Sequence, residues 1–403
     1  MKKRISLHIA VAMTMIIAAA SCRMSGTSTS DSHDADTLHM KYARNIVIVR
    51  HADFTQVDVR DPWHEGNILH TYLLVERGKR LPNGLKRNQN TDIVPVPVTR
   101  SIVTTAPHCQ LICWLGATNA IKGVCDAEYI HVEELQFQTE NNKKTKPQTA
   151  NFKPQTSNLK PQTVMDCGNS MQPMIEKIVE VRPQILLLSP FENSGGYGRL
   201  AQTGIPIIEC ADYMEPNALG RAEWMRFYGM LFGRQKQADS LFNVVERNYL
   251  SLRNKAQKLR KGRSILTERK TGSVWYCPGG HSTVAQIIRD ANGKYAFNDD
   301  DHSGSLALPF EQVLAKAADT QVWAFKINGQ KPLSKADLLA EYHGYSAMQA
   351  FRSGEIYQCN CMIRPYFEQI SFRPDWLLQE FIILLHPEQQ SFGKLRYYEK
   401  LSE

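Results

Sequence analysis

The sequence lacks the short motifs around which many enzymes build their catalytic sites. It contains no Gly-x-Ser-x-Gly elbow, no Walker phosphate-binding loop and no His-Glu-x-x-His pattern. Cys-x-x-Cys pairs and His-x-x-x-His spacings are also missing, so the sequence indicates no zinc site. The basic residues alternate with acidic ones and form no basic stripe with aromatic residues, which argues against nucleic acid as a partner. These absences argue against the common enzyme classes and against a nucleic-acid-binding protein.

What is present is an ordinary globular composition. The chain has 403 residues, of which 42% are hydrophobic and 22% charged, with a formal net charge of +8. This composition excludes a fibrous or fully disordered protein, and the length predicts about two domains.

The N-terminus has the pattern of an export signal. A positively charged start, Lys2 to Arg4, precedes an apolar run from Ile5 to Ala20, and small residues then lead to Cys22. This order is typical of a bacterial lipoprotein signal over residues 1–21, with cleavage before Cys22 and thioether lipidation of that cysteine. An ordinary secretory signal is the alternative. Both predict an exported protein, and the first places it in the periplasm as a membrane-anchored lipoprotein.

Residues 22–40 are rich in Ser, Thr and Asp, which predicts a flexible tether. No later segment is as hydrophobic as the signal, so we expect a soluble body. Besides Cys22 the chain has eight cysteines, an even number that permits disulfides in an oxidising compartment. Spacing alone leaves their pairing open, and buried free thiols are the alternative.

The alternation of predicted strands and helices indicates two α/β halves. We expect an N-terminal lobe over 41–233, a linking helix over 234–260 and a C-terminal lobe over 261–403. In the helix, apolar residues recur at helical spacing from Ala238 to Leu252. The sequence Lys-Pro-Gln-Thr occurs three times at seven-residue intervals within 138–163, where proline and low apolar content predict a mobile surface loop.

Two segments echo each other across the halves. Each is a predicted helix with a glutamate in its first turn, Glu176 or Glu311, followed by a tight turn and an apolar strand. The helix dipole alone favours an acidic residue at that position.

Several motifs in fixed order resemble the periplasmic substrate-binding proteins of ABC importers for siderophores, haem and cobalamin. They include Pro97–Val103, Ile175–Ile178 with Arg182–Leu186, Gly220–Trp224 and Trp275–Gly280. The segment Asp61–Trp63 with Thr71–Val75 is similar to the subgroup found in Bacteroidetes. The resemblance runs from about Tyr42 to the C-terminus, and the Lys-Pro-Gln-Thr insert departs from it.

The resemblance implies a class III periplasmic binding protein fold, in which one long rigid helix joins two Rossmann-like lobes. It implies a monomer that works with an ABC permease and ATPase, and no catalytic activity or intrinsic cofactor. The expected ligand is an iron-siderophore, haem or cobalamin. Glu176 and Glu311 correspond to the surface glutamates with which this family docks on the permease.

We expect the ligand between the lobes, where the carboxyl ends of the strands meet. Thr104, Thr105 and His108 follow a strand of the first lobe, and Tyr276, Gly279, Gly280 and His281 follow one of the second. Charged and aromatic residues that could contribute to the cleft are Arg221, Arg364, Tyr366 and Phe367. A zinc or manganese receptor is the alternative, but His108, His281 and His302 have no clear partner ligands in the sequence.

Overall fold

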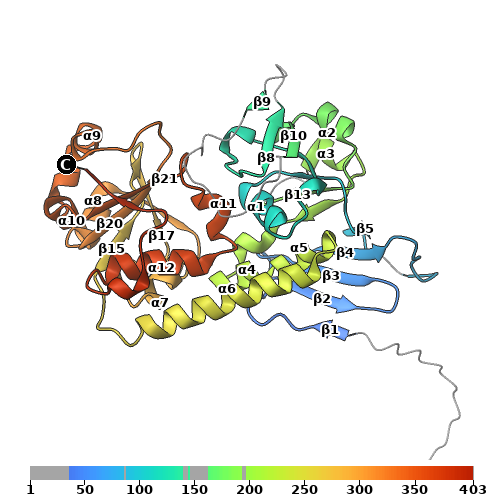
Figure 1. Ribbon diagram of the computed structural model, residues 1–403, viewed down its shortest axis with the longest axis horizontal. Helices are drawn as coiled ribbons and strands as arrows, with labels where there is room; N and C mark the ends of the chain where they lie inside the picture. Colours follow the sequence, from blue (N-terminus) through green and yellow to red (C-terminus); the bar gives the residue numbers. More distant parts are fainter. Residues whose placement is uncertain (1–35, 86–87, 139–143, 146–161, 193–196, 403) are drawn as a thin grey trace, which may run out of the picture. The chain divides into compact units, whose positions relative to one another are not determined.

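The computed structural model describes residues 36–85, 88–138, 144–145, 162–192 and 197–402 (Figure 1). Cys22, the signal segment and most of the Lys-Pro-Gln-Thr repeats lie outside these residues. Among the described residues, no helix has the length and apolar character needed to cross a membrane.

The chain begins with a five-stranded sheet in the order β1-β2-β3-β4-β5. Its strands are β1 Asp36–Leu38, β2 Ile46–Arg50, β3 Thr55–Arg60, β4 Ile68–Glu76 and β5 Thr91–Val96. Alternate residues such as Ile46, Ile48, Val57 and Val59 are buried, as expected for a sheet with one face on the core. The prediction of a tether up to residue 40 is wrong at its end, because Asp36–Leu38 pairs with β2.

A second sheet forms the α/β part of the N-terminal lobe, in the order β14-β13-β6-β7-β10-β8-β9. All neighbours pair in parallel except β8 and β9. The strands are β6 Ser101–Val103, β7 Ile121–Val124, β8 Leu135–Gln138, β9 Lys144–Thr145, β10 Gln162–Asp166, β13 Ile185–Leu188 and β14 Ile207–Glu209. A small hairpin joins β11 Gly168–Asn169 to β12 Gln172–Pro173.

The helices of this lobe are α1 Ala106–Trp114, α2 Ile175–Val181, α3 Gly198–Ala201, α4 Ala218–Glu223 and α5 Met225–Leu231. The prediction of a mobile loop over 138–163 is wrong at its margins. Gln138 ends β8, residues 144–145 form β9, and Gln162 begins β10.

The long helix α6, Gln235–Ala256, follows the first lobe. Its buried residues Ala238, Phe242, Val245 and Tyr249 recur every three or four positions, so they form one apolar stripe. The helix packs along this stripe against α5 and against α12, Pro374–Leu385 (Figure 1). It ends at residue 256, slightly earlier than the predicted limit of the linking segment.

The C-terminal lobe contains a sheet in the order β18-β15-β20-β21-β22 and a small antiparallel sheet, β16-β17-β19. The first consists of β15 Ser264–Thr267, β18 Lys294–Tyr295, β20 Val322–Ile327, β21 Ile356–Asn360 and β22 Glu399–Lys400. The second consists of β16 Lys270–Thr271, β17 Val274–Pro278 and β19 Ser305–Pro309. The helices besides α12 are α7 Thr283–Asp290, α8 Phe310–Ala317, α9 Lys335–Glu341, α10 Gln349–Ser353 and α11 Tyr366–Ile370.

Two buried glutamates attach residues 41–45, between β1 and β2, to the N-terminal lobe. Glu223 at the end of α4 accepts backbone N–H bonds from Lys41, Tyr42 and Ala43 at 2.7–3.0 Å. Glu215 accepts bonds from the N–H groups of Arg44 and Asn45, as well as from the indole N–H of Trp224. A buried carboxylate that gathers several N–H donors satisfies groups that water cannot reach.

We expect Glu223→Gln to destabilise the protein by about 2 kcal/mol, because one side-chain oxygen becomes an N–H₂ group that cannot accept a bond. Urea unfolding would measure the loss. The exposed Glu128→Gln, which makes the same chemical change, should leave the midpoint unaltered. Equal midpoints for wild type and Glu223→Gln would contradict the role assigned to this carboxylate.

Candidate functional site

A cavity of ≈ 500 Å³ is lined by both lobes. The first lobe contributes Tyr213, Met214 and Glu215, which follow the carboxyl end of β14. The second contributes residues after β15, on β17, at the start of α7 and before β19. They are Glu268, Arg269, Thr271, Tyr276, Pro278, His281, Ser282, Thr283, Val284, Ser303, Gly304 and Ser305.

A second cavity of ≈ 350 Å³ shares Glu268, Arg269 and Thr271 with the first. Its other lining residues are Lys326, Ile327, Asn328 and Phe367, at the end of β20 and on α11. Because they share these three residues, the two cavities are neighbours.

Aromatic side chains with exposed surface lie in both cavities. Tyr213 is 36% exposed and Tyr276 48% exposed in the larger one, and Phe367 is 46% exposed in the smaller one. Large apolar side chains that remain open to solvent in a concave site are available to stack on a flat ligand.

Each cation of the two cavities has an acidic partner within the protein. Arg269 pairs with Glu341 on α9, and Lys326 pairs with Glu268. Burial alone would lower the pKa of Lys326, but the charge of Glu268, the hydrogen bond with it and the neighbouring Tyr366 and Cys361 together outweigh burial and raise it. Lys326 is therefore charged, and an anionic ligand would have to compete with a glutamate for either cation.

Of the residues predicted to bind ligand, Tyr276 and His281 line the larger cavity and Phe367 lines the smaller. The other eight are not among the lining residues of these two cavities. Arg364 donates to the carbonyl of Arg396 at 2.7 Å and pairs with Glu399. Tyr366 is buried against Tyr397 and Tyr398.

Gly279 and Gly280 have a packing role in place of the predicted approach to an anion. A Cβ on Gly279 would lie 2.2 Å from the carbonyl oxygen of His302, and one on Gly280 would lie 2.2 Å from that of Asp300. Their N–H groups are already engaged, with the Gly304 carbonyl and the Asp300 carboxylate respectively. The glycines thus let the loop before β19 lie against β17 and shape the cavity rim.

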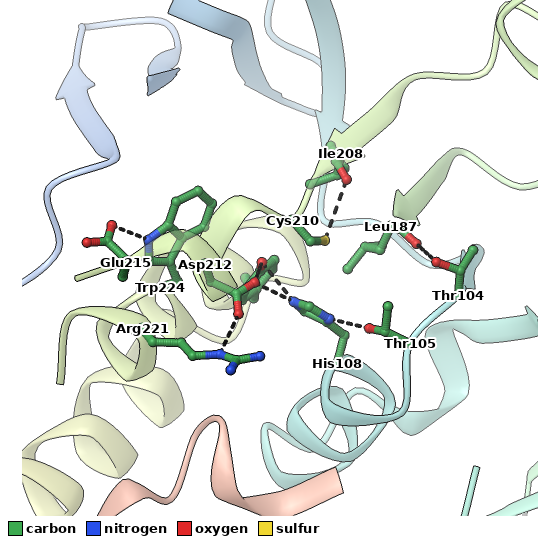
Figure 2. Close-up of polar contacts among 11 residues, drawn as sticks. Thr104, Thr105, His108, Leu187, Ile208, Cys210, Asp212, Glu215, Arg221 and Trp224 are labelled. Carbon is green, nitrogen blue, oxygen red and sulfur yellow. Dashed lines mark hydrogen bonds and ion pairs between the residues drawn. The ribbon is translucent and has the colours of Figure 1, made fainter. Parts of the chain in front are cut away.

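His108, on α1, lies in a buried polar network (Figure 2). Its Nε2 is 2.9 Å from both Asp212 Oδ1 and Tyr228 Oη, and its Nδ1 contacts Thr105 Oγ1. Arg221 donates to the other carboxylate oxygen of Asp212 at 3.2 Å. The network therefore brings together three residues of the predicted site, Thr105, His108 and Arg221. They surround the buried carboxylate of Asp212 and do not line either cavity.

Neighbouring groups determine the protonation states of His108 and Asp212. Burial alone would lower the pKa of His108, but Cys210 and Asp212 outweigh burial and raise it to about 10. Burial alone would raise the pKa of Asp212, and His108, Arg221 and Tyr228 together lower it. Thr104 is separate: its hydroxyl donates to the carbonyl of Leu187 on β13 at 3.1 Å (Figure 2).

The lobes also meet away from the cavities. Helix α1 packs against α11, and the buried Glu368 of α11 accepts the N–H of His131 at 3.0 Å. Trp114 of α1 contacts Trp376 of α12 edge to face, with ring centroids 5.9 Å apart. Burial raises the pKa of Glu368 to about 7. These contacts join the two lobes through residues that are far from the linking helix in the sequence.

Sequence reasoning missed Tyr213, Glu268 and Arg269. For Glu268 and Arg269 the signal was available, because they directly follow β15 and the carboxyl ends of strands were already the expected location. Tyr213 lies four residues beyond the end of β14, in a short 3-10 helix. Ser303 to Ser305 had no such signal, since the cavity reaches them through the antiparallel pairing of β17 with β19.

The two predicted docking glutamates lie in the first turns of α2 and α8, as expected. Both are exposed, and Glu176 lies 3.6 Å from Arg199. Within the described ranges, no group of three or more His, Cys, Asp or Glu side chains could hold a metal ion. The zinc or manganese alternative thus has no ligand set among those residues.

The charge on His108 gives a pH-dependent prediction. A folded-state pKa above the unfolded value of about 6.5 means that His108 stabilises the protein fully below that pH and loses this contribution as the pH rises toward 10. We expect the stability difference between wild type and His108→Gln to shrink by about 3 kcal/mol from pH 6 to pH 9. Urea unfolding at both pH values measures it, with the exposed His343→Gln as control. A difference independent of pH would show that His108 is neutral.

Comparison with known proteins agrees with this architecture. The sequence model of the periplasmic binding protein family matches residues 139–360, more than half of the chain. An uncharacterized lipoprotein of Methanocaldococcus jannaschii is 24% identical over 338 residues, which cover 82% of this chain and 75% of that protein.

Two solved structures have a similar fold. A periplasmic haem-binding protein of Pseudomonas aeruginosa is 14% identical with a TM-score of 0.56, covering 76% of this chain and 98% of that one. A siderophore-binding protein of Vibrio cholerae is 13% identical with a TM-score of 0.50, covering 72% and 99%. The chain therefore belongs to the periplasmic binding protein family, whose members are binding proteins and not enzymes, and it has the class III fold.

Proposed function

We propose that this protein captures an iron-siderophore, haem or cobalamin between its lobes and delivers it to an ABC permease. The observation that carries the proposal is the ≈ 500 Å³ cavity, which both lobes line and in which Tyr213 and Tyr276 remain exposed. A ligand held there touches both lobes at once, so a partner that contacts both lobes can sense whether the site is filled.

The size of the site suits a large ligand. Small-molecule pockets usually enclose about 300–1,000 Å³. The larger cavity is within that range, and the neighbouring ≈ 350 Å³ cavity adds space next to Glu268 and Arg269. A metal chelate or a macrocycle can use this space, whereas a bare metal ion needs only a few converging ligands.

The lining chemistry supports the same class of ligand. The rings of Tyr213 and Tyr276 provide flat apolar surface, while Arg269 and Lys326 provide positive charge. Haem, for example, combines a planar macrocycle with carboxylate groups. Exchange of an internal glutamate for a ligand carboxylate keeps each cation paired, so the binding energy depends on how much better the ligand fits.

We also propose that Cys22 carries a lipid that anchors the protein at the membrane. The small residues before Cys22 and the lipoprotein description of the relative from Methanocaldococcus support this. A monomeric protein on a lipid tether remains close to the permease, which raises its effective concentration there.

The test of capture is a titration of the purified protein with haemin, cyanocobalamin and ferric siderophores, followed by absorbance and tryptophan fluorescence. We expect one of them to bind, and Tyr276→Ala to weaken that binding about tenfold, as the loss of one stacking aromatic contact would. Tyr129→Ala is the matched control, because Tyr129 is 63% exposed and does not line either cavity. Binding that is insensitive to Tyr276→Ala would place the ligand elsewhere, and failure of all three ligand classes would reject the proposed cargo.

Docking is tested separately. The double variant Glu176→Ala with Glu311→Ala should reduce uptake in cells several-fold and leave ligand affinity unchanged, because exposed carboxylates steer association without touching the cavity. Glu180→Ala, on the same helix as Glu176, should preserve uptake. A loss of ligand affinity in the double variant, or normal uptake by it, would exclude these two glutamates as the docking pair.

A further inference from the structure

We infer that Cys359 and Cys361 are a disulfide site that closes when the protein folds in the cell envelope. The Sγ atoms of the two residues are 3.9 Å apart and in direct contact. Cys359 lies within β21 and Cys361 follows its last residue. Among the eight described cysteines, this is the pair whose sulfur atoms are in contact.

Both thiols lie on the same side of the chain. Cys361 lies one residue beyond β21, and the 3.9 Å contact shows that its side chain meets that of Cys359. A disulfide requires the sulfur atoms to approach to about 2.05 Å, which takes rotation about the two Cα–Cβ bonds together with adjustment of the backbone at Cys361. The residue between them is held in place, because the side-chain amide of Asn360 donates to the carbonyl of Gly329 at 2.7 Å.

The surroundings indicate when the bond forms. Cys359 is 0% exposed and Cys361 4% exposed, so oxidants cannot reach the pair in the folded protein. The hydrogen bond with Cys361 and burial both raise the pKa of Cys359, which makes the folded thiol unreactive. Oxidation therefore takes place before the C-terminal sheet closes over the pair, in a periplasm that supports disulfides.

The reaction is a two-step thiol–disulfide exchange with an oxidised dithiol protein of the envelope. The Cys361 thiolate attacks the disulfide of that protein, which breaks its S–S bond and forms a mixed disulfide. The Cys359 thiolate then attacks the Cys361 sulfur and releases the oxidant. Two protons and two electrons leave the cysteine pair, and the oxidant becomes a dithiol.

The position of the pair connects it to the ligand cavities. Cys359 is the register partner of Lys326 on β20, and the N–H of Cys361 donates to the carbonyl of Ile327 at 2.8 Å. Lys326, Ile327 and Asn328 line the smaller cavity. A disulfide between residues only two apart constrains the unfolded chain little. Its effect is therefore local: it fixes the conformation of the end of β21, next to the strand whose end lines this cavity.

Peptide mapping tests the inference. The full-length protein is isolated from the envelope, denatured with iodoacetamide present and digested with trypsin. The peptide that begins at Ser353 contains Cys359 and Cys361 and no other cysteine. We expect this peptide to be unalkylated and lighter by two hydrogen atoms than its reduced form, and to take up two alkyl groups only after treatment with dithiothreitol.

Two controls separate this result from misfolding or scrambling. Cys361→Ser should leave Cys359 alkylated without reduction, and Cys277→Ser, which removes another buried thiol, should leave the intact disulfide in place. Alkylation of both cysteines in the unreduced wild-type protein would overturn the inference. A disulfide that links either cysteine to a different one would overturn it as well.

Discussion

Buried glutamate carboxylates that accept backbone N–H groups fix two segments of the chain, one near residue 43 and one near residue 397. Glu223 and Glu215 bind five consecutive N–H groups from Lys41 to Asn45, at the point where the chain enters the N-terminal sheet. Glu380 on α12 does the same for Tyr397 and Tyr398 before the last strand. Because a buried carboxylate is costly unless it is fully hydrogen-bonded, these sites tolerate only the observed arrangement of the segments.

The ligand cavity depends on the same contacts. Glu215 both anchors Arg44 and Asn45 and lines the larger cavity, and its neighbour Tyr213 exposes a ring to that cavity. On the other lobe, the ion pairs of Arg269 and Lys326 keep charged groups neutralised in the absence of ligand. The site thus combines a rigid, internally satisfied polar frame with a few aromatic faces left open.

The network around His108 has a structural role of a similar kind. His108 and Arg221 both pair with Asp212, so the buried carboxylate faces a buried imidazole and a guanidinium that is 25% exposed. Phe372 from the other lobe packs against the rings of His108 and Tyr228, with centroids 5.5 and 6.0 Å away. The His108–Asp212 pair is therefore enclosed where the lobes meet, and the glutamates proposed for docking remain exposed on α2 and α8.

The sequence by itself determined the fold and many of the elements. The two α/β halves and the long helix between them were predicted, because the apolar periodicity that indicates them is a local signal. Strands such as β1, β8 and β10 were missed, since they are short and owe their conformation to neighbours in the sheet. The resemblance to periplasmic binding proteins was also readable from motif order alone.

Only the tertiary structure decided which predicted site residues reach the cavity. His108 follows a strand end, as ligand-binding residues do, but Asp212, 104 positions away, turns it into the core. Gly279 and Gly280 pack against the loop before β19, and the sequence around the two glycines does not indicate that this loop lies there. Side-chain direction depends on partners distant in the chain, and only folding brings those partners together.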